Sequence, residues 1–175
     1  MAEAVALTDV GALVKEGDPD RFEAALFAED DARERLFSVY GLNLECARTP
    51  WKVSEPQIGA MRLRWWLDVI EEAHGKSEAE APPRAHEVAG PLAEFIRLAR
   101  PPLELMQDMV TARLRDLDPE PMESEDELER YLGDTGGAVM RLAGWAARGG
   151  DPGAEADAAL GARGWAHGAA NLIEA

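Results

Sequence analysis

The chain has 175 residues, of which 46% are hydrophobic, so it is long enough to bury the core of one globular domain. It carries 34 acidic against 18 basic side chains, a formal net charge of −16. A field of that sign repels phosphate backbones, which argues against nucleic-acid binding. It also repels anionic lipid headgroups wherever no basic side chains gather, so contact with a membrane is expected to be peripheral at most.

Cysteine usage and the N-terminal sequence indicate a cellular compartment. The single cysteine, Cys46, excludes a disulfide framework within the chain and fits a reducing environment. The first twenty residues are acidic and lack the basic region of a secretory signal. No run approaches the roughly 18 apolar residues that a membrane span needs. We therefore expect a soluble, cytoplasmic protein.

Helix signals follow one another through the first half of the chain. Asp18-Pro19-Asp20 is typical of a helix start, with an acidic cap and a proline in the first turn. Glu29-Asp30-Asp31 predicts a second start, and apolar residues at i, i+4 spacing continue that helix through Ala47. Ser54-Glu55-Pro56 opens a third helix to about Ala73, which is apolar around most of its circumference.

The second half is also helical. Residues 85–98 form a moderate helical pattern, and a stronger one runs from 103 to 117. Ser124-Glu-Asp-Glu127 is a capping box that opens a long helix to about Arg148, and a last helix is expected over 156–175. Because no stretch shows strand alternation, the sequence predicts an all-α fold in which residues 1–175 form a single domain.

Three glycines interrupt the long helix, at positions 133, 136 and 137. Each costs about 1 kcal/mol against alanine inside a helix. Glycines retained at that cost indicate close backbone approach, a kink, or room for a ligand. The last helix also has small residues at close spacing, at Gly161, Gly164 and Gly168.

One face of the second predicted helix carries the best functional candidates. Tyr40, Asn43 and Ala47 share this face, and Trp51 follows if the helix continues past Pro50. An asparagine in an apolar stripe needs a hydrogen-bond partner from another side chain, water or a ligand. Glu45 points roughly 160° away from Ala47, at ~100° per residue, and so belongs to a different face.

From Asp20 to Asn171 the chain resembles the squalene/phytoene synthase family. No single segment is decisive, but the order and spacing of the segments match the family over most of the chain. The segments are Arg21-Phe22, Leu26-Phe27, Arg35 to Tyr40, Arg62 with Trp65-Trp66-Leu67-Asp68, Arg113 to Leu117, Leu128 with Tyr131, Thr135 to Val139, Gly164-Trp-Ala, and Asn171-Leu-Ile.

The resemblance implies an isoprenoid-synthase-like helical bundle around a central cavity. The chain would correspond to about the N-terminal two-thirds of that fold, with its C-terminal helices missing or truncated. The family joins two prenyl diphosphates head to head, using Mg²⁺ that two aspartate-rich motifs hold. Carboxylate clusters suit this task because the departing diphosphate needs cations to neutralise its charge.

This chain departs from the family where the metal should bind. The first motif falls on Ala47 and Trp51, neither of which can ligate a metal, and the first aspartate of the second motif falls on Ala175. The resemblance therefore implies no catalytic residue, no metal ligand and no cofactor. What it retains is a set of residues that would line the substrate cavity: Tyr40, Asn43, Ala47, Trp51, Tyr131, Gly137, Val139 and Asn171.

The motif Asn43-Leu-Glu45 and the Arg-x-x-Trp-Trp helix are similar to one branch of the family. That branch includes a mitochondrial assembly factor for respiratory complex I and bacterial relatives. The first hypothesis is thus a non-catalytic protein that binds a prenyl diphosphate or lipid, or that assists assembly by contacting respiratory-complex subunits.

Two other hypotheses stay open. The chain could be an active Mg²⁺-dependent prenyltransferase that uses the rearranged acids Asp68, Asp116 and Asp118, although Asp68 can simply pair with Arg64 on its helix. Asp116 and Asp118 oppose the dipole at a helix end, which invites a partner such as Arg113, Arg115 or a bound cation. Alternatively, Trp65, Trp66 and Met109 fill the interior, and the protein acts only through surface contacts.

Overall fold

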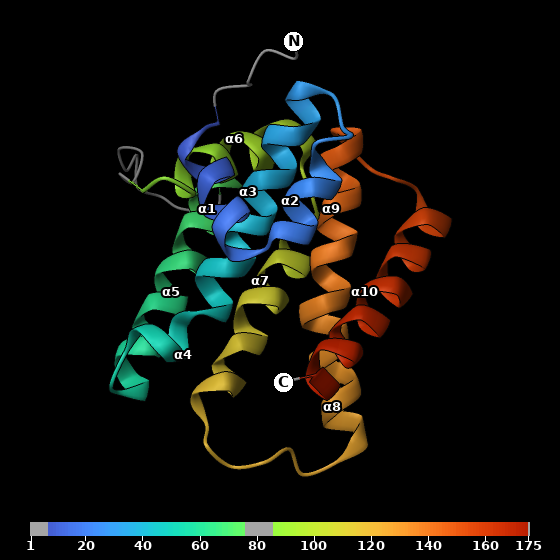
Figure 1. Ribbon diagram of the computed structural model, residues 1–175. Helices are drawn as coiled ribbons and strands as arrows, with labels where there is room; N and C mark the ends of the chain where they lie inside the picture. The colour runs from blue at the N-terminus through green and yellow to red at the C-terminus, as the bar shows by residue number, and fades with distance from the viewer. Residues whose placement is uncertain (1–6, 76–85, 175) are drawn as a thin grey trace.

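The fold was analysed in a computed structural model, which describes residues 7–75 and 86–174 (Figure 1). Within these residues the chain forms helices and no strand, which confirms the predicted all-α bundle. None of the described helices has both the length and the hydropathy to cross a membrane. The helices are α1 (Asp9–Gly17), α2 (Pro19–Ala25), α3 (Asp30–Ala47), α4 (Thr49–Lys52), α5 (Pro56–Ala73), α6 (Ala89–Ala99), α7 (Leu103–Ala112), η1 (Arg113–Leu117), α8 (Glu125–Leu132), η2 (Gly133–Gly137), α9 (Ala138–Arg148) and α10 (Ala154–Glu174).

Helix α3 is the centre of the bundle, and α1, α2, α6, α7 and α9 all pack against it (Figure 1). Every residue from Leu36 to Cys46 is buried. A helix buried on all sides is expected where its apolar residues occupy the whole circumference. The core around it is built from fully buried residues of several helices, including Phe37, Leu42, Leu63, Ile70, Phe95, Ile96, Met106, Met109 and Leu142.

Two of the predicted helix starts are confirmed by side-chain capping contacts. The carboxylate of Asp18 accepts a hydrogen bond from the backbone N–H of Arg21, with Pro19 in the first turn of α2. The hydroxyl of Ser124 accepts from the N–H of Glu127 at 3.2 Å. The reciprocal bond of the capping box shifts by one residue, because Glu127 Oε2 accepts from the N–H of Glu123 at 2.7 Å.

The helix predicted over 103–117 changes type before its end. It is α-helical to Ala112 and continues as the 3₁₀ turn η1. Side chains three residues apart are stacked in a 3₁₀ helix. This geometry brings Arg113 Nη1 to 3.2 Å from Asp116 Oδ2. The acid at the helix end thus has an arginine as its partner.

The helix predicted from Leu128 to about Arg148 contains a π-helical turn, η2, between α8 and α9. Helix α10 crosses this turn at very short range. A Cβ built on Gly136 would lie 2.5 Å from the carbonyl oxygen of Gly164, and one built on Gly164 would lie 2.2 Å from that of Gly136. Of the three explanations for the glycines, close backbone approach is the one observed at Gly136.

The other boundaries differ slightly from the predicted ones. Helix α10 begins at Ala154, two residues earlier than expected, and α6 begins at Ala89 rather than at residue 85, which lies outside the described residues. Before α6, His86 Nδ1 accepts a hydrogen bond from the backbone N–H of Val88 at 3.2 Å. This local turn occupies the residues that precede the helix.

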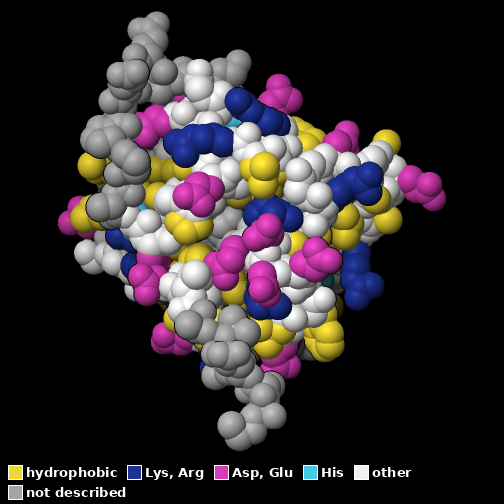
Figure 2. Space-filling model, turned by 90° about the horizontal axis from the view of Figure 1, so that it is seen from above, with side chains coloured by type: hydrophobic (Ala, Val, Ile, Leu, Met, Phe, Trp, Pro, Cys, Tyr) yellow, Lys and Arg dark blue, Asp and Glu magenta, His cyan; other side chains and the backbone are white. Residues whose placement is uncertain are grey.

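Seen from above, acidic and basic side chains are interspersed over the end of the bundle (Figure 2).

Replacing Gly164 with alanine should loosen the crossing of α10 over η2. The added methyl group meets backbone atoms, which cannot rotate away, so we expect a loss of about 1–3 kcal/mol in the free energy of unfolding. Urea denaturation followed by circular dichroism would measure it. The matched control is Gly133→Ala in η2, where an added Cβ meets nothing within 4 Å and no loss is expected. Equal effects of the two substitutions would contradict this reading of the crossing.

Candidate functional site

A cavity of about 240 Å³ lies where α3, η1, the α8–η2 segment and α10 meet. We call it the central pocket. Helix α3 contributes two residues that were predicted to share a face, Asn43 and Ala47, and α10 closes the opposite side. The residues that line it are Arg21, Asn43, Ala47, Arg113, Tyr131, Leu132, Thr135, Gly136, Val139, His167, Gly168, Asn171 and Leu172.

Arg113 joins the polar groups of this pocket into one network. Its Nη2 donates to Asn43 Oδ1 at 3.1 Å, and its Nη1 donates to the hydroxyl of Tyr131 at 3.0 Å. The same Nη1 donates to Asp116 Oδ2, and the Tyr131 hydroxyl in turn donates to Asp116 Oδ1 at 2.6 Å. The partner that a buried Asn43 was predicted to need is therefore a side chain of the protein itself.

The pKa of Tyr131 is raised within this network. Burial is the main cause that raises the pKa of this phenol to about 12, and the hydrogen bond to Asp116 adds to it. The positive charge of Arg113 acts in the opposite direction and is outweighed. Tyr131 is thus a hydrogen-bond donor to Asp116 at neutral pH rather than an ionised group.

A second arginine enters the pocket from the other side. Arg21 Nη1 forms an ion pair with Asp18 at 2.5 Å, and its guanidinium lies 5.7 Å from the centre of the Tyr40 ring. Burial raises the pKa of Tyr40 as well. Because Arg21 and Arg113 each have a carboxylate partner, the pocket has no large uncompensated positive charge for a diphosphate.

The structure brings together most of the residues that the sequence placed in a cavity. Asn43, Ala47, Tyr131, Val139 and Asn171 all line the central pocket. That they bind a substrate stays a prediction.

The other three predicted cavity residues lie elsewhere. Tyr40 is buried behind Arg21, and Gly137 lines a separate shallow hollow beside α10. Trp51 was expected to continue the face of Ala47 only if the helix ran past Pro50, and this condition is not met. Helix α3 ends at Ala47, and the chain turns into the short α4, whose first turn contains Pro50. The Trp51 side chain is 87% exposed there.

Some pocket residues were missed by the sequence reasoning. Arg113 was considered only as a partner for Asp116, and its bond to Asn43 joins residues 70 positions apart. His167 lies 3.3 Å from the Asn171 amide through its Nε2, one turn away on α10. Arg21 was noted only as part of a segment that resembles the family, and nothing in the sequence indicated that it would line the pocket.

The residues of the pocket do not fit a magnesium ion. Ala47 lines it without an oxygen donor, and Trp51 lies outside it. The three acids considered as replacements are each paired with an arginine: Asp68 with Arg64 at 3.2 Å, Asp116 with Arg113 at 3.2 Å, and Asp118 with Arg115 at 3.7 Å. Among the described residues, no group of three or more His, Cys, Asp or Glu side chains could hold a metal ion.

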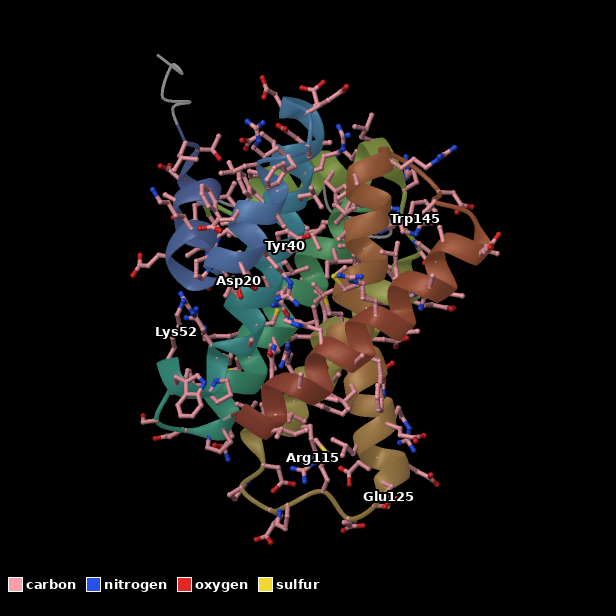
Figure 3. All side chains as sticks on the ribbon, turned by 45° about the vertical axis from the view of Figure 1, so that its right-hand side comes forward. Asp20, Tyr40, Lys52, Arg115, Glu125 and Trp145 are labelled. Atoms are coloured by element: carbon pink, nitrogen blue, oxygen red, sulfur yellow. The ribbon has the colours of Figure 1, made fainter. Side chains whose placement is uncertain are left out.

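Two of the three residues that one hypothesis placed in the interior of the bundle are buried there. Trp66 is 2% exposed and Met109 is fully buried, whereas Trp65 is half-buried beside the core. Figure 3 shows how densely side chains occupy the space between the helices, with Arg115 and Glu125 marking the lower end of the bundle.

Glu45 faces away from the central pocket, as its angular separation from Ala47 predicted. It is buried, and its Oε1 lies 2.7 Å from Lys52 Nζ. Its Oε2 lies 3.4 Å from Arg62 Nη2 and 3.9 Å from His86 Nε2. The motif Asn43-Leu-Glu45 thus places one polar side chain on each of two opposite sides of α3.

Comparison with known proteins adds a family and its relatives. The squalene/phytoene synthase family model matches residues 14–175. Complex I assembly factor 6 from Bos taurus is 23% identical over 130 residues, and those from Homo sapiens and Mus musculus are 24% identical over the same length. The match covers 74% of this chain but only 38% of each relative. No solved structure was found to match.

Removing Arg113 should destabilise the fold through its partners. Arg113→Met removes the cation that pairs with Asp116, which keeps only its bond from Tyr131, and leaves the Asn43 amide oxygen without its donor, so we expect a loss of about 2–4 kcal/mol in the free energy of unfolding. In a double-mutant cycle with Asn43→Leu, a coupling energy of about 1 kcal/mol is expected. Arg97→Met, on an exposed side chain of α6, serves as the control and should change stability by less than ~0.5 kcal/mol. Zero coupling would show that the Arg113–Asn43 bond does not contribute.

Tyr131 should make stability depend on pH in alkaline solution. The pKa of about 12 in the folded protein lies above the value of about 10 for an unfolded chain, so this contribution to stability is fully present below pH 10 and is lost as the pH rises to about 12. Urea denaturation at several pH values would show the wild type losing its advantage over Tyr131→Phe across that interval. A difference between the two proteins that stays constant from pH 9 to 12 would overturn the assignment.

Proposed function

We propose that this chain, which belongs to the squalene/phytoene synthase family, is a non-catalytic member that serves the assembly of a respiratory complex. One observation carries the proposal. At the positions where the resemblance places the family's metal-binding aspartates, this chain has Ala47 and Trp51, and the nearby acid Asp116 is bonded to Arg113 and Tyr131. Without metal ligands, the departure of a diphosphate lacks the charge neutralisation that it requires.

The relatives support the assembly role. The proteins from cattle, human and mouse that this chain matches are named complex I assembly factors. We infer that subunits of a respiratory complex are the partners of this chain too. The inference concerns the part of those proteins that the match covers, which is 38% of their length.

A prenyl lipid is the proposed occupant of the central pocket. Val139, Ala47 and Leu132 offer apolar contacts, and Asn43 and Tyr131 offer polar ones. The cavity of about 240 Å³ is smaller than the roughly 300–1,000 Å³ typical of small-molecule sites. This favours part of one isoprenoid chain over the two prenyl diphosphates that a synthase must hold together.

The proposal predicts no turnover of prenyl diphosphates. The full-length protein, incubated with farnesyl diphosphate and Mg²⁺, should release no diphosphate above the protein-free rate, and Mg²⁺ should leave its thermal midpoint unchanged. The alternative is an active head-to-head prenyltransferase that uses Asp68, Asp116 or Asp118. Metal-dependent release that disappears in Asp118→Asn or Asp68→Asn would establish that alternative and end the proposal.

In the source organism, loss of the gene should reduce the amount of assembled respiratory complex I. Native gel electrophoresis of membranes would measure it. The wild-type gene and the double variant Asp68→Asn/Asp118→Asn should restore assembly equally. Both acids lie in surface ion pairs, and the proposed assembly role does not use them as metal ligands. An unchanged complex in the deletion strain would contradict the assembly role, whatever the outcome of the enzyme assay.

A further inference from the structure

A second hollow lies on the outer side of α5, away from the central pocket, and the proposed function does not use it. Ile58, Met61, Arg62 and Trp65 line it from successive turns of α5, and Trp66 and His86 complete it. We call it the α5 pocket. Its volume of about 440 Å³ falls within the range typical of small-molecule sites. None of these residues lines the central pocket.

The floor of the α5 pocket is aromatic and rigid. The rings of Trp65 and Trp66 meet edge to face with centroids 4.7 Å apart, and the His86 ring lies 5.5 and 5.1 Å from them. Trp66 is only 2% exposed, so the packing of the core fixes this floor. The hydrogen bond from the Val88 N–H to His86 Nδ1 holds the third ring in place.

The rim of the pocket is apolar and open to solvent. Met61 is 72% exposed and Ile58 is 45% exposed, one turn apart on the same helix. Adjacent exposed apolar side chains around a hollow mark a site that takes an apolar group. Methionine is well suited to such a rim because its flexible side chain adapts to the shape of what it contacts.

One end of the pocket carries positive charge. Glu45 is a single buried carboxylate that faces two cations, Lys52 at 2.7 Å and Arg62 at 3.4 Å, so the three groups together carry a formal charge of +1. The Arg62 side chain is 42% exposed and lines the pocket. A guanidinium has five N–H donors. Arg62 can therefore donate hydrogen bonds to a bound anion while its ion pair with Glu45 keeps the Arg62 side chain in position.

We propose that the α5 pocket binds an amphipathic carboxylate of the fatty-acid class. The carboxylate pairs with Arg62, and the aliphatic chain lies over the Trp65 ring and between Met61 and Ile58. The charge of the cluster selects this class. A quaternary ammonium would suit the aromatic floor but is repelled by Arg62, and an uncharged chain gains nothing from it.

The test uses the full chain and three probes of equal chain length. Dodecanoate, titrated below its micellar concentration and followed by calorimetry, should bind saturably at one site. Dodecanol and dodecyltrimethylammonium should each bind at least about tenfold more weakly. Dodecanol cannot form the charge-assisted hydrogen bond with Arg62, and the ammonium group is repelled by the charge of Arg62. Equal affinity for the three probes, or binding that does not saturate, would overturn the proposal.

Matched variants on one helix locate the site. Arg62→Gln should weaken dodecanoate binding about tenfold and leave dodecanol unchanged. Arg64→Gln is the control, because Arg64 is also on α5 but pairs with Asp68 and does not line the pocket. Circular dichroism would confirm that both variants fold. Should Asn171→Ala, in the central pocket, abolish binding while Arg62→Gln leaves it intact, the ligand belongs to the central pocket and the proposal fails.

Discussion

The burial of α3 on all sides is the constraint from which the rest of the molecule follows. A polar group without a partner inside a protein costs several kcal/mol, so the two strongly polar side chains in the buried run from Leu36 to Cys46 must be satisfied. Asn43 is satisfied by Arg113, and Glu45 by Lys52 and Arg62. Because the two side chains point to opposite sides of the helix, each partnership forms the polar part of a different pocket.

In the central pocket, the charged and polar side chains are directed at each other. Asp116 accepts hydrogen bonds from Arg113 and Tyr131, and Arg21 pairs with Asp18. If either arginine left its ion pair to bind a diphosphate, its carboxylate partner would lose its cation and would repel the diphosphate. Internal charge compensation therefore stabilises the bundle and opposes the entry of a second, highly charged anion.

The sequence could predict features that depend on local spacing. The all-α fold, the caps at Asp18 and Ser124 and the opposite directions of Ala47 and Glu45 follow from helix geometry and composition. It could not predict the Arg113–Asn43 bond, because only the tertiary fold brings residues so distant in the chain into contact. The placement of Trp51 in the cavity does not hold for a local reason, because the chain turns between α3 and α4 and the helical face of Ala47 ends there.

The distribution of charge connects the two pockets. The chain has 18 basic and 34 acidic side chains. Many of the basic ones form ion pairs, such as Arg113–Asp116, Arg115–Glu127 and Arg141–Asp157. Anions therefore meet a surface with a net negative charge over most of the molecule. The cluster around Glu45 differs because two cations face one carboxylate. A singly charged carboxylate matches that excess of one charge, whereas a diphosphate would need the additional cations that this fold has already paired internally.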